Sequence, residues 1–167
     1  MPHASDFRTG RHVVYALAAH LVFVPKYRRK VITEKVYGIL RAAWETVCTD
    51  FQCELRESGY ETDHVHLLVA YPPKVSLSTL VNSLKGVSAR RIRQANFPEV
   101  QRALWGPHFW SPSYCVVSCG GAPLEVVKRY IQEQAGDGTQ NSCGIPDEEL
   151  VALLESTNTE GSGSSPP

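Results

Sequence analysis

The hydrophobic pattern along the first half of the chain predicts a strand, a helix and a pair of strands. Residues 12–24 are apolar on both faces and end at Pro25, a pattern that favours a central strand. Thr33 can cap a helix, because the apolar positions that follow it keep helical spacing. Residues 52–60 and 64–71 then follow as two strands joined by a short polar turn, which predicts a hairpin.

A second helix and a further strand follow in the second half. Ser76 can open a helix with a regular apolar face, and residues 113–119 have the composition of a short strand. The segment between them holds Pro98 and Gly106, so we expect it to be a loop. Pro123 suits the first turn of a last helix.

The resulting order is β-α-β-β-α-β followed by an extra helix. This is the split βαβ order of ferredoxin-like, RRM-like folds, which are α+β folds. We therefore expect a four-stranded antiparallel sheet backed by two helices, with the extra helix at the C-terminal end. Residues 1–138 would form this domain, and residues 139–167 would be an acidic, flexible tail.

Charge is distributed unevenly along the 167 residues, although the formal net charge is zero. All 17 lysines and arginines precede residue 135, together with 11 of the 17 acids, so residues 1–134 carry a charge of +6. Residues 135–167 hold the other six acids and no basic residue. A basic body is compatible with a polyanionic partner, and this charge alone is weak evidence for one.

Cysteine count and hydropathy exclude several classes of protein. The five cysteines are odd in number and include no Cys-x-x-Cys pair, which argues against a disulfide framework and a zinc ribbon. Free thiols in a reducing compartment are the simpler expectation. No apolar run approaches the roughly 18–20 residues that span a bilayer, so we expect a cytoplasmic protein with no membrane partner.

Two pairs of residues carry candidate chemistry. His64 and His66 alternate along a predicted strand, so both imidazoles would point to one side of the sheet and could share a metal ion. Tyr130 and Gln134 lie four residues apart on the predicted last helix, which puts a phenol and an amide on one helical face. Taken alone, each pair also suits a purely structural role.

Basic residues gather in two segments that suit contacts with a nucleic acid, although each also suits a solvated surface. The first is a loop and the second a helix, and together they comprise Lys26, Arg28, Arg29, Lys30, Lys85, Arg90, Arg91 and Arg93. Nearby aromatic residues could stack on unpaired bases, but we expect most of them in the core. These are Trp105, Phe109, Trp110 and Tyr114.

Five blocks of sequence, in order, resemble one enzyme family. They are residues 24–30 (VPKYRRK), 63–69 (DHVHLLV), 84–91 (LKGVSARR), 104–106 (LWG) and 130–134 (YIQEQ). Together these blocks resemble the single-tyrosine HUH transposases of the insertion-sequence 200/605 type.

The resemblance implies a metal-dependent enzyme that cuts and rejoins single-stranded DNA at the hairpin ends of a mobile element. Tyr130 would attack the scissile phosphate and form a 5′-phosphotyrosine link. His64, His66 and Gln134 would be the metal ligands, with Mg²⁺ the expected ion and Mn²⁺ or another divalent ion able to substitute. No nucleotide cofactor is needed, because the phosphotyrosine keeps the energy of the broken linkage.

The resemblance also implies a homodimer in the cytoplasm of a prokaryotic cell. The helix of Tyr130 would reach across to the histidines of the other subunit. Gly120 and Gly121 precede that helix and are candidate hinges, because glycine permits backbone angles that other residues resist.

Two alternatives remain open. One is a domesticated relative that acts on repeated palindromes, which the protein sequence alone cannot separate from an active mobile element. The other is a non-catalytic module for single-stranded nucleic acid, since RNA-recognition folds share the predicted topology. That class places stacking aromatics where this chain has His64 and His66.

Overall fold

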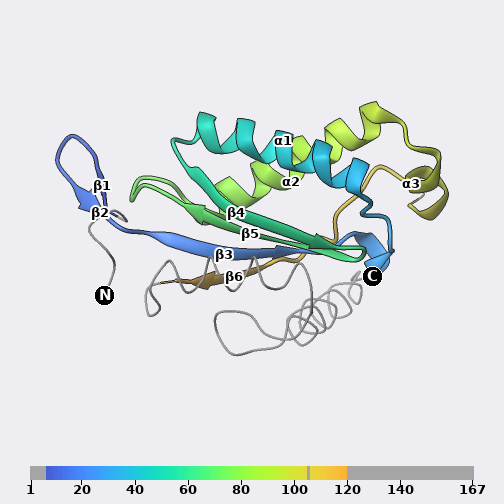
Figure 1. The fold of residues 1–167 in the computed structure, drawn as a ribbon, viewed down its shortest axis with the longest axis horizontal. Helices are drawn as coiled ribbons and strands as arrows, with labels where there is room; N and C mark the ends of the chain where they lie inside the picture. Colours follow the sequence, from blue (N-terminus) through green and yellow to red (C-terminus); the bar gives the residue numbers. More distant parts are fainter. Residues whose placement is uncertain (1–6, 105, 120–167) are drawn as a thin grey trace, which may run out of the picture.

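The computed structural model describes residues 7–104 and 106–119 and confirms the ferredoxin-like fold (Figure 1). The four-stranded antiparallel sheet has the strand order β4-β5-β3-β6, and a two-stranded hairpin, β1-β2, stands beside it. The strands are β1 (Arg8–Thr9), β2 (Val14–Tyr15), β3 (Ala18–Phe23), β4 (Glu54–Glu61), β5 (His64–Ala70) and β6 (Cys115–Ser118). The helices are η2 (Lys26–Arg28), α1 (Glu34–Asp50), α2 (Leu77–Ala95) and α3 (Pro98–Ala103).

Helices α1 and α2 cover one face of the sheet, and the hydrophobic core lies between this helical layer and the sheet (Figure 1). Alternation in β5 supplies the sheet side of that core, because Val65, Leu67 and Val69 all point toward the helices. Trp44 of α1 and Leu84 of α2 are fully buried against them. The two-residue period of β5 therefore leaves its even-numbered residues on the opposite face.

The hairpin of β4 and β5 was predicted correctly, and the first strand was predicted too long. Residues 12–24 divide into β2, which pairs with β1, and β3, which pairs with β5 and β6. The pairing of β3 with β5 begins at Ala18 opposite Ala70. It cannot extend past Pro72 and Pro73 as a regular ladder, because proline has no N–H to donate.

The predicted loop between the second helix and the last strand contains the short helix α3. Pro98 occupies its first turn, where a missing N–H costs nothing. A helix of six residues is too short to show helical periodicity, so the sequence pattern presents Pro98 only as a helix breaker.

The two predicted N-terminal caps differ in their hydrogen bonds. Thr33 accepts a hydrogen bond from the N–H of Val36, whereas Ser76 makes no side-chain cap bond.

Several expectations concern residues outside the described part of the chain. They are the last helix with Tyr130 and Gln134, the hinge residues Gly120 and Gly121, the tail at 139–167, and Trp105. Within the described residues, Cys48 and Cys53 are free thiols. No helix in the same part of the chain is long and apolar enough to cross a membrane.

Candidate active site

His64 and His66 lie on the sheet face opposite α1 and α2, as the alternation of β5 predicts. We call this the histidine face and define it by His20, Val22, His64, His66 and Leu68. Val22 of β3 lies directly opposite His66 in the sheet, and His20 lies opposite Leu68. The ring centroids of His64 and His66 are 6.0 Å apart, and both residues are buried. The spacing predicted from sequence therefore brings the two imidazoles together.

A carboxylate fixes the orientation of the first imidazole. Asp63, in the turn before β5, lies with its Oδ1 2.8 Å from Nδ1 of His64, and its Oδ2 accepts a bond of 3.0 Å from Nε of Arg28. Burial alone would raise the pKa of Asp63, but the hydrogen bond and charge of His64, with those of Arg28, outweigh it and leave the pKa below its usual value. Asp63 is therefore an ionised acceptor for both neighbours.

Two neighbours of His66 were not predicted as site residues. The ring of His20 lies 5.9 Å from that of His66, centroid to centroid. Gly59 of β4 lies opposite His66, and a Cβ atom added there would be 2.5 Å from Nε2 of His66. The imidazole therefore lies against the bare backbone of β4, a position that only glycine leaves open.

The predicted DNA-contacting residues have different environments. Arg29, Lys30, Arg90 and Arg93 are exposed, and Lys26 is half-buried. Arg28 is bound to Asp63, as described above. Arg91 donates a hydrogen bond of 3.2 Å to the hydroxyl of Thr46.

Lys85 differs most from a surface cation. Its Nζ donates hydrogen bonds to the carbonyls of Ser111, at 2.5 Å, and Ser113, at 3.1 Å. It also lies within 6 Å of the ring centroids of Phe23 and Tyr114. Burial lowers the pKa of Lys85 to about 8. These contacts give Lys85 a role in holding the segment before β6 against α2.

Aromatic residues of the last loop belong mainly to the core, as expected. Phe109 and Trp110 are buried, and Tyr114 is partly buried against the core. The indole N–H of Trp110 donates to the hydroxyl of Ser88, 3.0 Å away.

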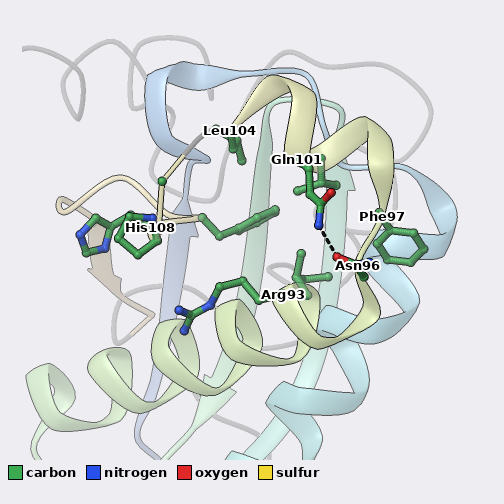
Figure 2. Close-up of a pocket in the computed structure, with 11 residues that line it drawn as sticks. Arg93, Asn96, Phe97, Gln101, Leu104 and His108 are labelled. Carbon is green, nitrogen blue, oxygen red and sulfur yellow. Dashed lines mark hydrogen bonds between the residues drawn. The ribbon is translucent and has the colours of Figure 1, made fainter.

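A pocket of about 390 Å³ opens at the C-terminal end of α2, separate from the histidine pair. Figure 2 shows Arg93 and His108 on one side of it and Phe97, Asn96 and Gln101 on the other. The side chains of Asn96 and Gln101 hydrogen-bond to each other across α2 and α3. Neither His64 nor His66 lines this pocket, so it is not part of the candidate active site.

Comparison with known proteins identifies the family of this chain. Residues 13–134 match the family described as "Transposase IS200 like". TnpA, the transposase of ISDra2 from Deinococcus radiodurans, is 33% identical over 129 residues, which cover 77% of this chain and 91% of that protein. The IS200 transposase of Salmonella typhimurium is 26% identical over 144 residues, covering 84% of this chain and 93% of the relative.

A solved structure supports the same relationship. The crystal structure of a candidate transposase from Deinococcus radiodurans aligns with a TM-score of 0.62 and 35% identity, covering 76% of this chain and 97% of that one. The fold and the similarity along most of the chain thus agree. The chain therefore belongs to the IS200-like family of transposases, enzymes that cut and rejoin DNA.

Proposed function

We propose that the chain is a divalent-metal-dependent transposase that cuts and rejoins single-stranded DNA at hairpin-bearing ends through Tyr130. The observation that carries the proposal is the pair of imidazoles on the histidine face, with Asp63 on the far nitrogen of His64. That arrangement is typical of metal sites, where a carboxylate behind a ligating histidine fixes its tautomer and raises its basicity.

The donor chemistry of the described residues fits a divalent ion. When the Nδ1–H of a neutral His64 ring donates its hydrogen bond to Asp63, the lone pair of that ring is on Nε2, the atom that would bind metal. Across the described ranges, no group of three His, Cys, Asp or Glu residues is arranged to hold a metal ion. The histidine pair would therefore be a partial ligand set, and Gln134 is the proposed third ligand. The ion we expect is Mg²⁺, with Mn²⁺ or another divalent ion able to substitute.

The proposed chemistry consists of two transesterifications. The phenolic oxygen of Tyr130 forms a bond to the scissile phosphorus and loses its proton, while the P–O3′ bond breaks and the leaving 3′-oxygen gains a proton. A 3′-hydroxyl then attacks the phosphotyrosine, and the phenol is restored. A bound divalent ion would stabilise negative charge on the phosphate oxygens. One phosphodiester is exchanged for another at each step, so no nucleotide cofactor is required.

The proposed assembly is a homodimer in which the helix of Tyr130 serves the histidines of the other subunit. Mixing Tyr130→Phe subunits with His64→Ala subunits tests the arrangement. We expect cleavage to return in the heterodimers, and stable heterodimers with no restored cleavage would exclude action in trans.

The direct test is a denaturing gel of the full chain with single-stranded oligonucleotides from both flanks of its own gene. We expect a covalent protein–DNA band with Mg²⁺ or Mn²⁺ that disappears with chelator, in Tyr130→Phe and in His64→Ala. Tyr15→Phe, which removes a phenol from β2, is the matched control and should keep the band. Hairpin binding without a band under any metal would instead indicate a non-catalytic module.

A further inference from the structure

The loop between β3 and α1 presents an aromatic ring to solvent. Tyr27, in the short helix η2, is 60% exposed and is the most exposed of the phenylalanines, tyrosines and tryptophans in the described part of the chain. It comes shortly after the C-terminal end of β3, in the segment that leads to α1. The flanking Pro25 and Val31 are buried, so the loop packs against the core while the ring of Tyr27 points to solvent.

The backbone of this loop is held in an unfavourable conformation. Tyr27 and Arg28 have φ angles of +61° and +50°, and both are left-handed residues that are not glycine. Backbone hydrogen bonds hold this part of the loop, among them one from the N–H of Lys26 to the carbonyl of Phe109 at 2.8 Å and one from the N–H of Arg28 to the carbonyl of Pro25 at 2.9 Å. Strain of this kind persists where the surroundings enforce it and is concentrated at functional sites.

The same loop carries positive charge and connects directly to the histidine face. Nζ of Lys26 lies 5.2 Å from the ring centroid of Tyr27, and Arg29 is exposed beside it. Arg28, the next residue after Tyr27, donates to Asp63, which is hydrogen-bonded to His64. The exposed ring therefore projects from a rigid basic loop that is two hydrogen bonds from a proposed metal ligand.

We propose that Tyr27 is a stacking platform for one unpaired base of the DNA strand that enters the histidine face. Lys26, Arg29 and Lys30 would contact the phosphates on either side of that base. An exposed ring among cations suits single-stranded nucleic acid, because an unpaired base offers an open π-face and a duplex does not. The inference rests on the proposed function, since it requires a single-stranded substrate at this site.

The variants must separate loss of the ring from loss of the fold. Tyr27→Asn removes the ring and keeps a residue that tolerates left-handed backbone angles, so the loop should keep its shape. Tyr27→Phe keeps the ring. Phe7→Ala is the matched control, because Phe7 is also an exposed aromatic residue, 46% exposed, and it precedes the β1-β2 hairpin. Melting temperatures of all four proteins should agree closely.

The assay is fluorescence anisotropy with labelled single-stranded oligonucleotides from the flank that the wild-type protein binds. Each oligonucleotide of the set carries one abasic site, at successive positions. Tyr27→Asn should weaken binding to the intact strand by about 5- to 160-fold, the range expected for one stacked base, and Tyr27→Phe and Phe7→Ala should bind like wild type. One abasic position should weaken wild-type binding and leave Tyr27→Asn binding unchanged.

The outcomes separate this inference from the proposed function. If the wild-type protein binds and forms its covalent band, while Tyr27→Asn binds equally well or responds to every abasic position as wild type does, the stacking role is excluded and the transposase proposal stands. If the wild-type protein binds no single strand and forms no band, both proposals fail.

Discussion

The contact between Gly59 and His66 gives the sharpest test of the histidine face. Gly59→Ala would place a Cβ atom 2.5 Å from Nε2 and 2.8 Å from Cδ2 of His66. Carbon atoms in ordinary contact are about 3.5–4.0 Å apart, so the imidazole must move by about 1 Å. The ring is 3% exposed and has His20 and His64 as neighbours on the same face, so that movement disturbs the proposed ligand pair.

Two effects of Gly59→Ala follow from this displacement. Overpacking of this kind costs about 1–3 kcal/mol of unfolding free energy, so the melting temperature should fall. A misplacement of about 1 Å at a reacting centre can cost about 100-fold in rate. We therefore expect formation of the covalent protein–DNA band to slow by about that factor, and Mn²⁺ binding to weaken with it.

Gly38→Ala is the matched control. Gly38 lies on α1, and a Cβ atom added there meets no atom within 4 Å. That substitution should stabilise the protein by about 0.5–1 kcal/mol, because alanine favours helix more than glycine does. The measurements are thermal unfolding by circular dichroism and single-turnover band formation below both melting temperatures. A Gly59→Ala protein that melts and cleaves like wild type would refute the proposed contact.

Three further predictions concern other parts of the molecule. Asp63→Asn should lower metal affinity or the cleavage rate by about 10- to 100-fold, because it removes the charged acceptor behind His64; isothermal titration with Mn²⁺ measures this, and an unchanged affinity and rate would contradict it. The pKa of Lys85 is lowered to about 8 by burial, so the folded protein loses that proton before the unfolded chain does, and this group should make the unfolding free energy rise between about pH 8 and pH 10.5. Urea unfolding across that range should show the rise in wild type and not in Lys85→Met, and equal slopes would count against the burial. Ending the chain after residue 140 should leave the covalent band unchanged, and a large loss would show that the acidic tail takes part in cleavage.

The sequence predicts the fold and the two histidines because both depend on local periodicity. Alternation along β5 is sufficient to place His64 and His66 on one face and Val65 and Leu67 on the other, and the structure confirms it. The five-block resemblance adds Tyr130 and Gln134, which stay predictions because they lie outside the described residues.

The contacts that surround the histidines depend on strand register, which periodicity does not determine. Gly59 faces His66 only because the register of β4 against β5 shifts between Leu55 and Glu57. His20 reaches the same face through the pairing of β3 with β5. Asp63 is adjacent to His64 in sequence, so of these contacts its role as an acceptor was the one that the sequence alone could have indicated.

Cation roles were equally hard to predict, because charge alone does not show what a side chain contacts. Lys85 and Arg91 belong to one predicted basic helix, yet one binds backbone carbonyls and the other binds a threonine hydroxyl. Arg28 comes from the other basic cluster and is bound to Asp63. Distinguishing these environments required the tertiary fold.

The alternation of β5 makes stable folding and correct placement of the two histidines depend on the same strand register. A slip of one residue in its pairing would turn Val65, Leu67 and Val69 toward the histidine face and force His64 and His66 against Trp44 and Leu84. Such a form would lose both the apolar contacts of its core and the paired imidazoles of the histidine face. A molecule that has folded stably has therefore already placed both imidazoles on the correct side of the sheet, so a misassembled copy cannot persist as a stable competitor for DNA.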